Sequence, residues 1–136
     1  MDKNIFVDTC FFKALVDIED DFYQQAKNLW GEFRESKETL ITSNFIVDEV
    51  LTLIRLRCGL KKAITFRDLL AENSQIIKIV RVTVTDEAGA WKWFEKDWSK
   101  LSYTDCVSFA LIKRLGVKRV ASFDEHFKRA GFRVEK

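Results

Sequence analysis

Short apolar runs alternate with longer amphipathic segments along almost the whole 136-residue chain. The amphipathic segments repeat apolar residues every three or four positions, which predicts helices; they are Asp21–Arg34, Asn44–Arg57, Leu60–Ala71, Asp86–Trp98 and Thr104–Leu115. The short runs are rich in Ile, Val and Phe, as buried strands are; they are Ile5–Val7, Leu40–Thr42, Ile76–Val82, Val117–Phe123 and Phe132–Val134. Strands separated by helices of this length favour a parallel sheet. We therefore predict an α/β fold with a central, mainly parallel sheet of four to five strands and helices on both faces.

The composition favours one packed domain over residues 1–136. Proline is absent and the five glycines are scattered, so no linker divides the chain. A hydrophobic content of 47%, with 12 Phe and 4 Trp, is typical of a packed globule rather than a disordered chain. The net charge of +2 neither demands nor excludes a nucleic-acid partner.

The cysteine and histidine content argues against a structural zinc site. Cys10, Cys58 and Cys106 form no C-x-x-C pair, and His126 is the only histidine. Three buried thiols are typical of a reducing cytosol. The first apolar run lacks a basic leader, and no stretch has the length of a membrane span. We therefore expect a soluble cytoplasmic protein without membrane association.

Four acidic residues lie where predicted strands pass into helices. Asp8 directly follows the first strand, and Asp124 follows the fourth. Glu49 lies about two helical turns beyond the second strand, and Asp105 lies in the first turn of the helix Thr104–Leu115. Ligands of open parallel sheets bind in the crevice beyond the carboxyl ends of the strands. All four acids are therefore candidates for a single crevice.

Each acid also has an ordinary structural explanation. Asp8 and Asp124 suit helix N-caps, Asp105 completes an acidic capping box with Ser102, and Glu49 suits a solvated helix position. Only their joint arrangement distinguishes the two interpretations. Two unit charges 4 Å apart interact by about 4 kcal/mol at an effective dielectric of 20, so a converging cluster takes up protons or binds a cation. Oxygen donors suit Mg²⁺ or Mn²⁺, and such an ion suits phosphodiester hydrolysis.

The segments that carry these acids resemble the PIN domain, and more closely the small stand-alone PIN proteins of the VapC toxin type. They read IFVDTCFF, TSNFIVDEVLTLI and SYTDCVSFALIKRLGVKRVASFDEHF, and the resemblance runs from Ile5 to Phe127. It implies a parallel sheet between helices and a Mg²⁺- or Mn²⁺-dependent ribonuclease activity. It also implies a partner antitoxin that covers the site, and a homodimer. For the cleavage we expect in-line attack by water that leaves a 5′-phosphate and a 3′-hydroxyl.

The resemblance also assigns site residues one by one. Catalysis and metal binding fall to Asp8, Glu49, Asp105 and Asp124. Hydroxyl groups that would bond the carboxylates or a metal-bound water belong to Thr9, Thr104 and Ser122. Asp48 competes with Glu49, but the two point about 100° apart on a helix, and the family pattern favours Glu49. We assign no chemistry to Cys10, and we interpret His126 as a surface histidine.

Candidate RNA-binding and partner-binding residues follow from charge and hydrophobicity. Basic residues that could hold an RNA backbone, although each alone is more often a solvated surface charge, are Arg55, Arg57, Lys61, Lys62, Arg67, Lys113, Arg114, Lys118 and Arg119. Aromatic residues that could stack on bases, although core packing suits them as well, are Phe11, Phe12 and Trp91. Apolar residues that exceed the need of one small core and indicate an interface are Phe11, Phe12, Leu15 and Trp30.

Three other interpretations deserve comparison. Phosphatases of the haloacid dehalogenase type need a second acid two residues after the first, where this chain has Cys10. Receiver-type signalling domains need an acid pair near the first strand and a lysine after the last, and neither is convincing here. A PIN-like scaffold that binds RNA or protein without cutting remains as the alternative, although all four acids are present.

Overall fold

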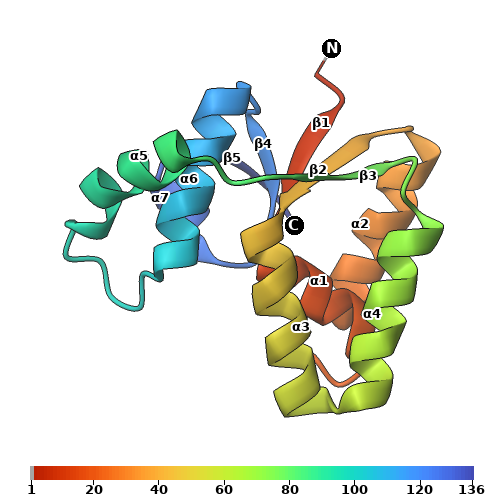
Figure 1. Ribbon diagram of the computed structural model, residues 1–136. Coiled ribbons are helices and arrows are strands. Elements are labelled where there is room, and N and C mark those ends of the chain that lie inside the picture. The colour runs from red at the N-terminus through yellow and green to blue at the C-terminus, as the bar shows by residue number, and fades with distance from the viewer. Residues whose placement is uncertain (1) are drawn as a thin grey trace.

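Five parallel strands form one sheet in residues 2–136, the part of the chain that this computed structural model describes (Figure 1). The strands are β1 (Asn4–Val7), β2 (Thr39–Ser43), β3 (Ile77–Val80), β4 (Arg119–Ala121) and β5 (Arg133–Glu135). Their order is β3-β2-β1-β4-β5, and every neighbouring pair is parallel. The central strand β1 therefore lies beside β4, so the residues that follow these two strands emerge next to each other.

The helices form two groups on either side of the sheet (Figure 1). One group contains α1 (Thr9–Val16), α2 (Tyr23–Glu35), α3 (Asn44–Cys58) and α4 (Leu60–Glu72). The other contains α5 (Val84–Phe94), α6 (Tyr103–Leu115) and α7 (Glu125–Arg129). This confirms the predicted α/β fold with a parallel sheet covered on both faces, which is a three-layer arrangement.

Local sequence signals fix the helix ends that position the site. The Ser43 hydroxyl accepts a hydrogen bond from the Ile46 amide and begins α3 directly after β2. Ser102 and Asp105 form a reciprocal capping box at the start of α6. Gly116, in the left-handed region at φ 70°, ends that helix. The helices that carry Glu49 and Asp105 therefore begin at positions fixed by their own sequence.

Several predicted elements have different bounds in the structure, and α1 and α7 lie outside the five predicted helical ranges. The predicted helix Asp86–Trp98 is α5, which begins two residues earlier and ends at Phe94. Its start is a capping box between Thr83 and Asp86, which a search for apolar spacing does not detect. The predicted strand Val117–Phe123 contains only the three residues of β4. Helix α7 has five residues, too few for a helical period to show in the sequence.

Burial corrects the expected roles of two aromatic residues. Phe11 and Phe12 are fully buried in the core, so the prediction that they form an interface or stack on bases is wrong. Their side chains contact other core rings, with Phe12 edge-on to Phe66 at 5.2 Å between ring centroids. Helix α1 is apolar because it is enclosed by the other helices of its layer, and its composition does not signal a free surface.

The described residues also test two expectations about the cell environment. Cys10, Cys58 and Cys106 are all free, but only Cys106 is buried, while the other two are half-buried. Among residues 2–136, no helix combines the length and the apolar character that crossing a membrane requires.

Candidate metal centre

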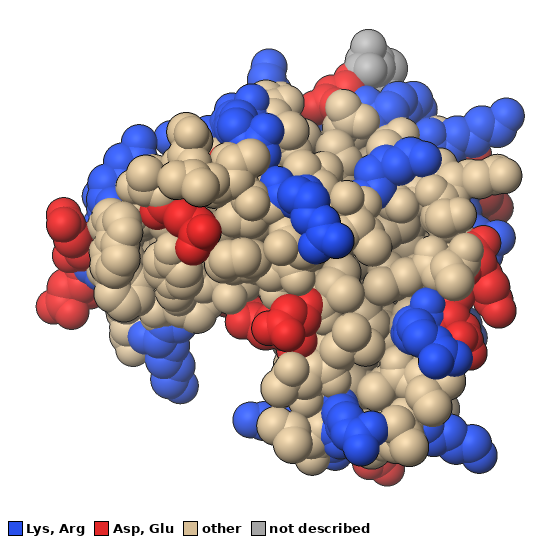
Figure 2. Space-filling view, in the orientation of Figure 1, with Lys and Arg blue, Asp and Glu red and all other residues tan. Residues whose placement is uncertain are grey.

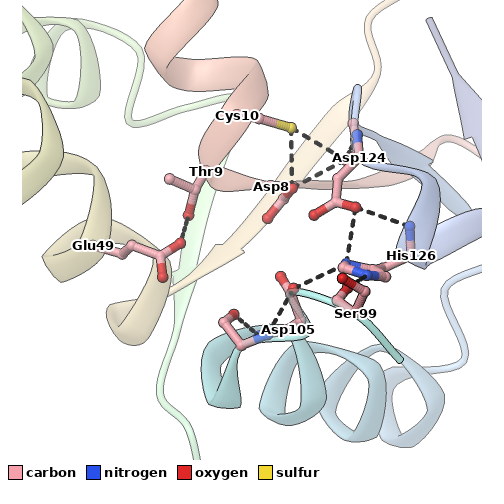
Figure 3. A network of polar contacts seen from close by, with 10 residues as sticks. Asp8, Thr9, Cys10, Glu49, Ser99, Asp105, Asp124 and His126 are labelled. Carbon is pink, nitrogen blue, oxygen red and sulfur yellow. Dashed lines mark hydrogen bonds and ion pairs between the residues drawn. The ribbon is translucent and has the colours of Figure 1, made fainter. Parts of the chain in front are cut away.

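The carboxylates of Asp8, Asp105 and Asp124 point toward one another at the carboxyl edge of the sheet (Figure 3). Asp8 follows β1, Asp124 follows the neighbouring β4, and Asp105 lies in the first turn of α6. Glu49, on α3, faces this group from the other helical layer (Figure 3). The structure thus brings together residues that lie up to 116 positions apart in the chain, as the interval from Asp8 to Asp124 shows.

Asp8 is buried for a reason other than helix capping. It occupies the N-cap position of α1, but its side chain makes no capping hydrogen bond. Its Oδ2 atom instead accepts hydrogen bonds from the Ser122 hydroxyl at 3.0 Å and from the Cys10 thiol at 3.1 Å. Its exposed fraction is 3%. Burial, reinforced by the charge of Asp105, raises the pKa of Asp8 from 3.8 to about 7.

Asp105 and Asp124 both cap helices and both belong to the cluster. One Asp105 oxygen accepts the Ser102 backbone amide at 3.3 Å, and Asp124 Oδ1 accepts the His126 amide at 2.9 Å. Each carboxylate has further lone pairs, so capping does not exclude a second role. Burial, followed by the charge of Asp124, raises the pKa of Asp105 to about 6. The two interpretations of these acids are therefore compatible.

Glu49 lies at the margin of the cluster. Its carboxylate accepts a hydrogen bond from the Thr9 hydroxyl, which links α3 to the first residue of α1. Its charge is one of the causes that raise the pKa of Asp105. The neighbouring Asp48 is exposed, as the rotation of about 100° per helical residue requires.

The three predicted hydroxyl groups differ in what they contact. Thr9 holds Glu49, and Ser122 donates to Asp8 while it accepts the Asp124 backbone amide at 3.0 Å. Ser122 therefore ties the loop after β4 to the acid after β1. The Thr104 hydroxyl, by contrast, makes no hydrogen bond to any of the acids within the described chain.

His126 is a site residue that sequence reasoning missed. Its Nδ1 atom lies 3.0 Å from Asp124 Oδ1 and 3.5 Å from Asp105 Oδ2, and its Nε2 atom lies 2.8 Å from the Ser99 carbonyl oxygen. The ring also stacks on Trp98, with 6.3 Å between centroids. The interpretation of His126 as a surface residue is therefore wrong. The available signal was its position two residues after Asp124, within one helical turn.

Cys10 is the second residue without a predicted role that contacts the site. Its thiol lies between Asp8 and Ser122, at 3.1 and 3.2 Å, and its sulfur accepts the Phe123 amide. Burial and the charge of Asp8 raise the pKa of this thiol far above its ordinary value, so Cys10 stays protonated and donates to Asp8.

An open pocket of about 410 Å³ adjoins the cluster. Cys10, Phe123 and Asp124 form the side nearest the acids. The remaining lining comes from α1, the α1–α2 connection and α3, and consists of Lys13, Glu19, Asp20, Asp21, Phe22 and Leu53. The acids are therefore reached through a partly apolar, partly acidic recess.

Several of the predicted RNA-binding residues are held in ion pairs. Arg114 binds both oxygens of the buried Asp86, at 2.7 and 2.9 Å. Arg119 binds Glu135 at 2.8 Å and Glu38 at 3.3 Å, at the amino end of β4, opposite the acids. These two arginines serve the fold. Figure 2 shows Lys and Arg side chains over the free end of the α3–α4 hairpin, where Arg55, Arg57, Lys61 and Lys62 lie.

The donor set fits a hard divalent cation. Asp105, Asp124 and His126 each offer one atom within 4.8 Å of the others, and the buried Asp8 lies close enough to Asp105 for their charges to interact. Carboxylates that face one another in a buried site take up protons or bind a cation. Carboxylate oxygens are the donors that Mg²⁺ and Mn²⁺ prefer, and an imidazole nitrogen is a donor for transition metals.

Comparison with known proteins agrees with the fold. Residues 5–133 match the family model described as the PIN domain. The chain belongs to the PIN domain family. This match includes all four acids and His126, and it spans both helical layers of the sheet.

Within the PIN domain family, the chain is similar to VapC-type toxins. It is 33% identical over 129 residues to the 23S rRNA-specific endonuclease VapC20 of Mycobacterium tuberculosis, covering 94% of this chain and 95% of the relative. The crystal structure of VapC20, described as a sarcin-ricin loop cleaving toxin, superimposes with a TM-score of 0.83 over the same shares.

Two more distant structures share the fold. FitAcB from Neisseria gonorrhoeae has 15% identity and a TM-score of 0.69, covering 97% of this chain and 96% of its own. VapBC2 from Rickettsia felis, bound to a DNA fragment from its promoter, has 12% identity and a TM-score of 0.64, covering 97% of each chain. At these identities the likeness concerns the fold alone.

Proposed function

We propose that this PIN domain is a metal-dependent endoribonuclease and the toxin of a toxin–antitoxin pair. The observation that carries the proposal is the buried pair Asp8 and Asp105, whose pKa values rise to about 7 and about 6 beside Asp124. A fold that places such charges together without a paired cation stores an electrostatic cost that a divalent ion relieves. The similarity to VapC20 along nearly the whole chain supports RNA as the substrate class.

Asp8, Asp105 and Asp124 would hold the ion, and Glu49 would act from the margin of the site. When bound, Mg²⁺ or Mn²⁺ polarises a phosphodiester and makes a water molecule more acidic. The chain's own contribution is positional. Ser122 and Cys10 fix the Asp8 carboxylate, and the Thr9 hydroxyl fixes Glu49 for accepting a proton from the attacking water.

RNA cleavage in the presence and absence of EDTA tests the proposal. A stem-loop with the sarcin-ricin sequence of 23S rRNA is the first substrate to use, because that loop is named for VapC20. We expect cleavage that requires Mg²⁺ or Mn²⁺, leaves 5′-phosphate ends, and disappears in Asp8→Asn and Asp105→Asn. Asp48→Asn, which changes an exposed acid on α3, is the matched control and should cut like the wild type.

Equal cutting by the two site variants would assign the activity to a contaminant. RNA binding that survives in all proteins without any cutting would favour the non-catalytic scaffold. Gel electrophoresis of the labelled stem-loop separates a scaffold from a nuclease. A scaffold retards the stem-loop in a native gel and leaves its length unchanged.

An antitoxin segment would occupy the recess beside the acids. Phe22 is an exposed apolar side chain that lines the recess. Further exposed apolar side chains are Ile18 on the same α1–α2 connection and Leu56 and Leu60 on the α3–α4 hairpin. Glu19 and the two following acids make the recess attractive to a basic side chain. Co-expression with the protein encoded beside this gene should yield a complex, and that complex should weaken in Leu56→Glu.

A homodimer would use a second apolar surface on α5. Val84 and Trp91 are 85% and 54% exposed, and Phe94 is exposed as well. Light scattering should give a dimer mass for the wild type and for Leu56→Glu, and a monomer mass for Val84→Glu. The two variants are matched controls, since each adds one carboxylate to an exposed apolar position on a different surface.

A cytoplasmic location is consistent with these roles. Cys10, Cys58 and Cys106 are all free thiols, as is usual in a reducing compartment. Ribosomal RNA, the substrate class proposed here, is also found there.

A further inference from the structure

We propose that His126 is a direct ligand of the divalent ion through its Nδ1 atom, so that the centre contains one nitrogen donor among its carboxylate oxygens. The inference rests on the proposed metal-dependent function and names a ligand that the four acids do not include. Its basis is the geometry of three groups around one imidazole ring: Ser99, Asp105 and Asp124.

The Ser99 contact fixes which ring nitrogen carries the proton. The backbone carbonyl oxygen of Ser99 accepts hydrogen bonds and cannot donate one. The Nε2 atom, 2.8 Å away, must therefore carry a hydrogen. In the neutral ring this leaves a lone pair on Nδ1, the atom that faces the acids. Metal-binding histidines are commonly held in this way, with the other ring nitrogen donating to a carbonyl or carboxylate.

The Nδ1 contacts differ from hydrogen bonds in their direction, because a separation of about 3.0 Å is also an ordinary hydrogen-bond length. Nδ1 lies 3.0 Å from Asp124 Oδ1 and 3.5 Å from Asp105 Oδ2. Within residues 2–136, however, this buried atom has no hydrogen-bond partner, so its bonding direction points at neither oxygen. Adjacent corners of an octahedron with bonds of about 2.1 Å lie about 3.0 Å apart. The Nδ1–Asp124 distance matches that spacing and the Nδ1–Asp105 distance is somewhat longer, so both oxygens lie within reach of an ion bound to Nδ1.

The ring is held in this orientation before any ion arrives. It stacks on Trp98 at an interplanar angle of 14°, and Arg129 covers the same indole at 4.4 Å. Because α5 ends at Phe94, Trp98 and Ser99 lie in the connection that reaches His126. A nitrogen donor also shifts preference from Mg²⁺ toward Mn²⁺, since imidazole favours transition metals over Mg²⁺.

Pulsed electron paramagnetic resonance of the Mn²⁺-loaded, tag-free protein tests the inference directly. Since His126 is the only histidine, an imidazole nitrogen coupled to Mn²⁺ can come from no other residue. We expect a ¹⁴N coupling in the wild type that changes to a ¹⁵N pattern after labelling with [¹⁵N]histidine. We also expect Mn²⁺ binding at least about 10-fold weaker in His126→Ala, the low end of the range for supporting groups around metals.

The outcomes separate this inference from the proposed function. Mn²⁺-dependent RNA cleavage without nitrogen coupling would overturn the histidine ligand and leave the nuclease intact. Nitrogen coupling without RNA cleavage would support the ligand and contradict the nuclease. A wild type that binds no Mn²⁺ would overturn the ligand, whatever its activity. The decisive spectrum comes from the wild type, so it does not depend on the folding of a variant.

Discussion

Replacing Asp8 with asparagine is expected to stabilise the metal-free protein at pH 8 while it abolishes RNA cleavage. The pKa of Asp8 rises from 3.8 to about 7, chiefly because the carboxyl group is buried. A difference of about 3 pH units corresponds to roughly 4 kcal/mol of preference for the uncharged form in the folded state. Only 3% of Asp8 is exposed, so solvent screens little of this cost. Asparagine removes the charge and keeps an oxygen that accepts hydrogen bonds from Ser122 and Cys10.

The stabilisation by Asp8→Asn should depend on pH. Between pH 3.8 and about 7 the folded protein holds a proton on Asp8 that the unfolded chain has released. The stability of the metal-free wild type therefore falls as pH rises through this window. Allowing for imperfect pairing of the new amide, we expect a gain of about 2–4 kcal/mol at pH 8, or on the order of 10 °C in Tm. The gain should shrink to about 1 kcal/mol at pH 5, where the wild-type carboxyl is protonated.

Urea unfolding in EDTA, followed by circular dichroism at both pH values, measures these free energies. Asp48→Asn controls for the loss of one negative charge at an exposed position and should change stability by at most about 0.5 kcal/mol. Saturating Mn²⁺ should reduce the difference in unfolding free energy between the two proteins at pH 8. Ligand at 100 times Kd adds about 2.7 kcal/mol to the unfolding free energy of the wild type. A folded Asp8→Asn protein that is no more stable than wild type at pH 8, or equally stabilised at pH 5, would refute the reasoning.

Three further predictions address other parts of the molecule. Asp86→Ala should lower stability by about 2–4 kcal/mol in thermal melts, because it leaves Arg114 without its buried partner and removes a helix cap, while the folded variant should still cut RNA. Thr9→Val should keep the wild-type Tm within a few degrees but lower kcat about 10-fold or more in single-turnover assays, because Glu49 loses the donor that orients it. Arg55→Ala combined with Lys61→Ala should weaken the binding of a labelled RNA. It should also reduce the slope of log affinity against log salt concentration by up to about 1.4, roughly 0.7 for each lost contact to single-stranded RNA. An unchanged slope would show that the RNA binds elsewhere on the protein.

The fold was predictable because its signals are local and repeated. Strands such as Ile5–Val7 are continuous apolar runs, and helices such as Asn44–Arg57 show an apolar period that ends at Gly59. The carboxyl ends of parallel strands lie at one edge of the sheet. Because Asp8 and Asp124 each directly follow a predicted strand, both were expected at that edge. Those acids are adjacent because β1 and β4 are neighbours, a pairing that the sequence alone did not specify.

The missed residues depend on contacts between segments that carry no joint signal. The orientation of the His126 ring depends on Ser99, 27 residues earlier in the chain, whose carbonyl oxygen accepts the Nε2 hydrogen. The enclosure of Phe11 follows from the packing of four helices, and an apolar helix looks the same in sequence whether covered by its own chain or by a partner. Arg114 looked free for RNA because its partner, Asp86, lies 28 residues away.

Three helix N-termini converge on the acids, and this explains how the fold tolerates them without a cation. Asp8, Asp105 and Asp124 stand at the starts of α1, α6 and α7, where free amides and the helix dipole favour negative charge. That interaction amounts to at most about 2 kcal/mol in favourable, partly buried sites, whereas the net rise in the pKa of Asp8, caused chiefly by burial and then by the charge of Asp105, corresponds to roughly 4 kcal/mol. The helix starts therefore offset only part of the repulsion, and the remainder keeps the pKa of Asp8 near 7. The same residue types that begin helices thus form a site whose unbalanced negative charge would favour a bound cation.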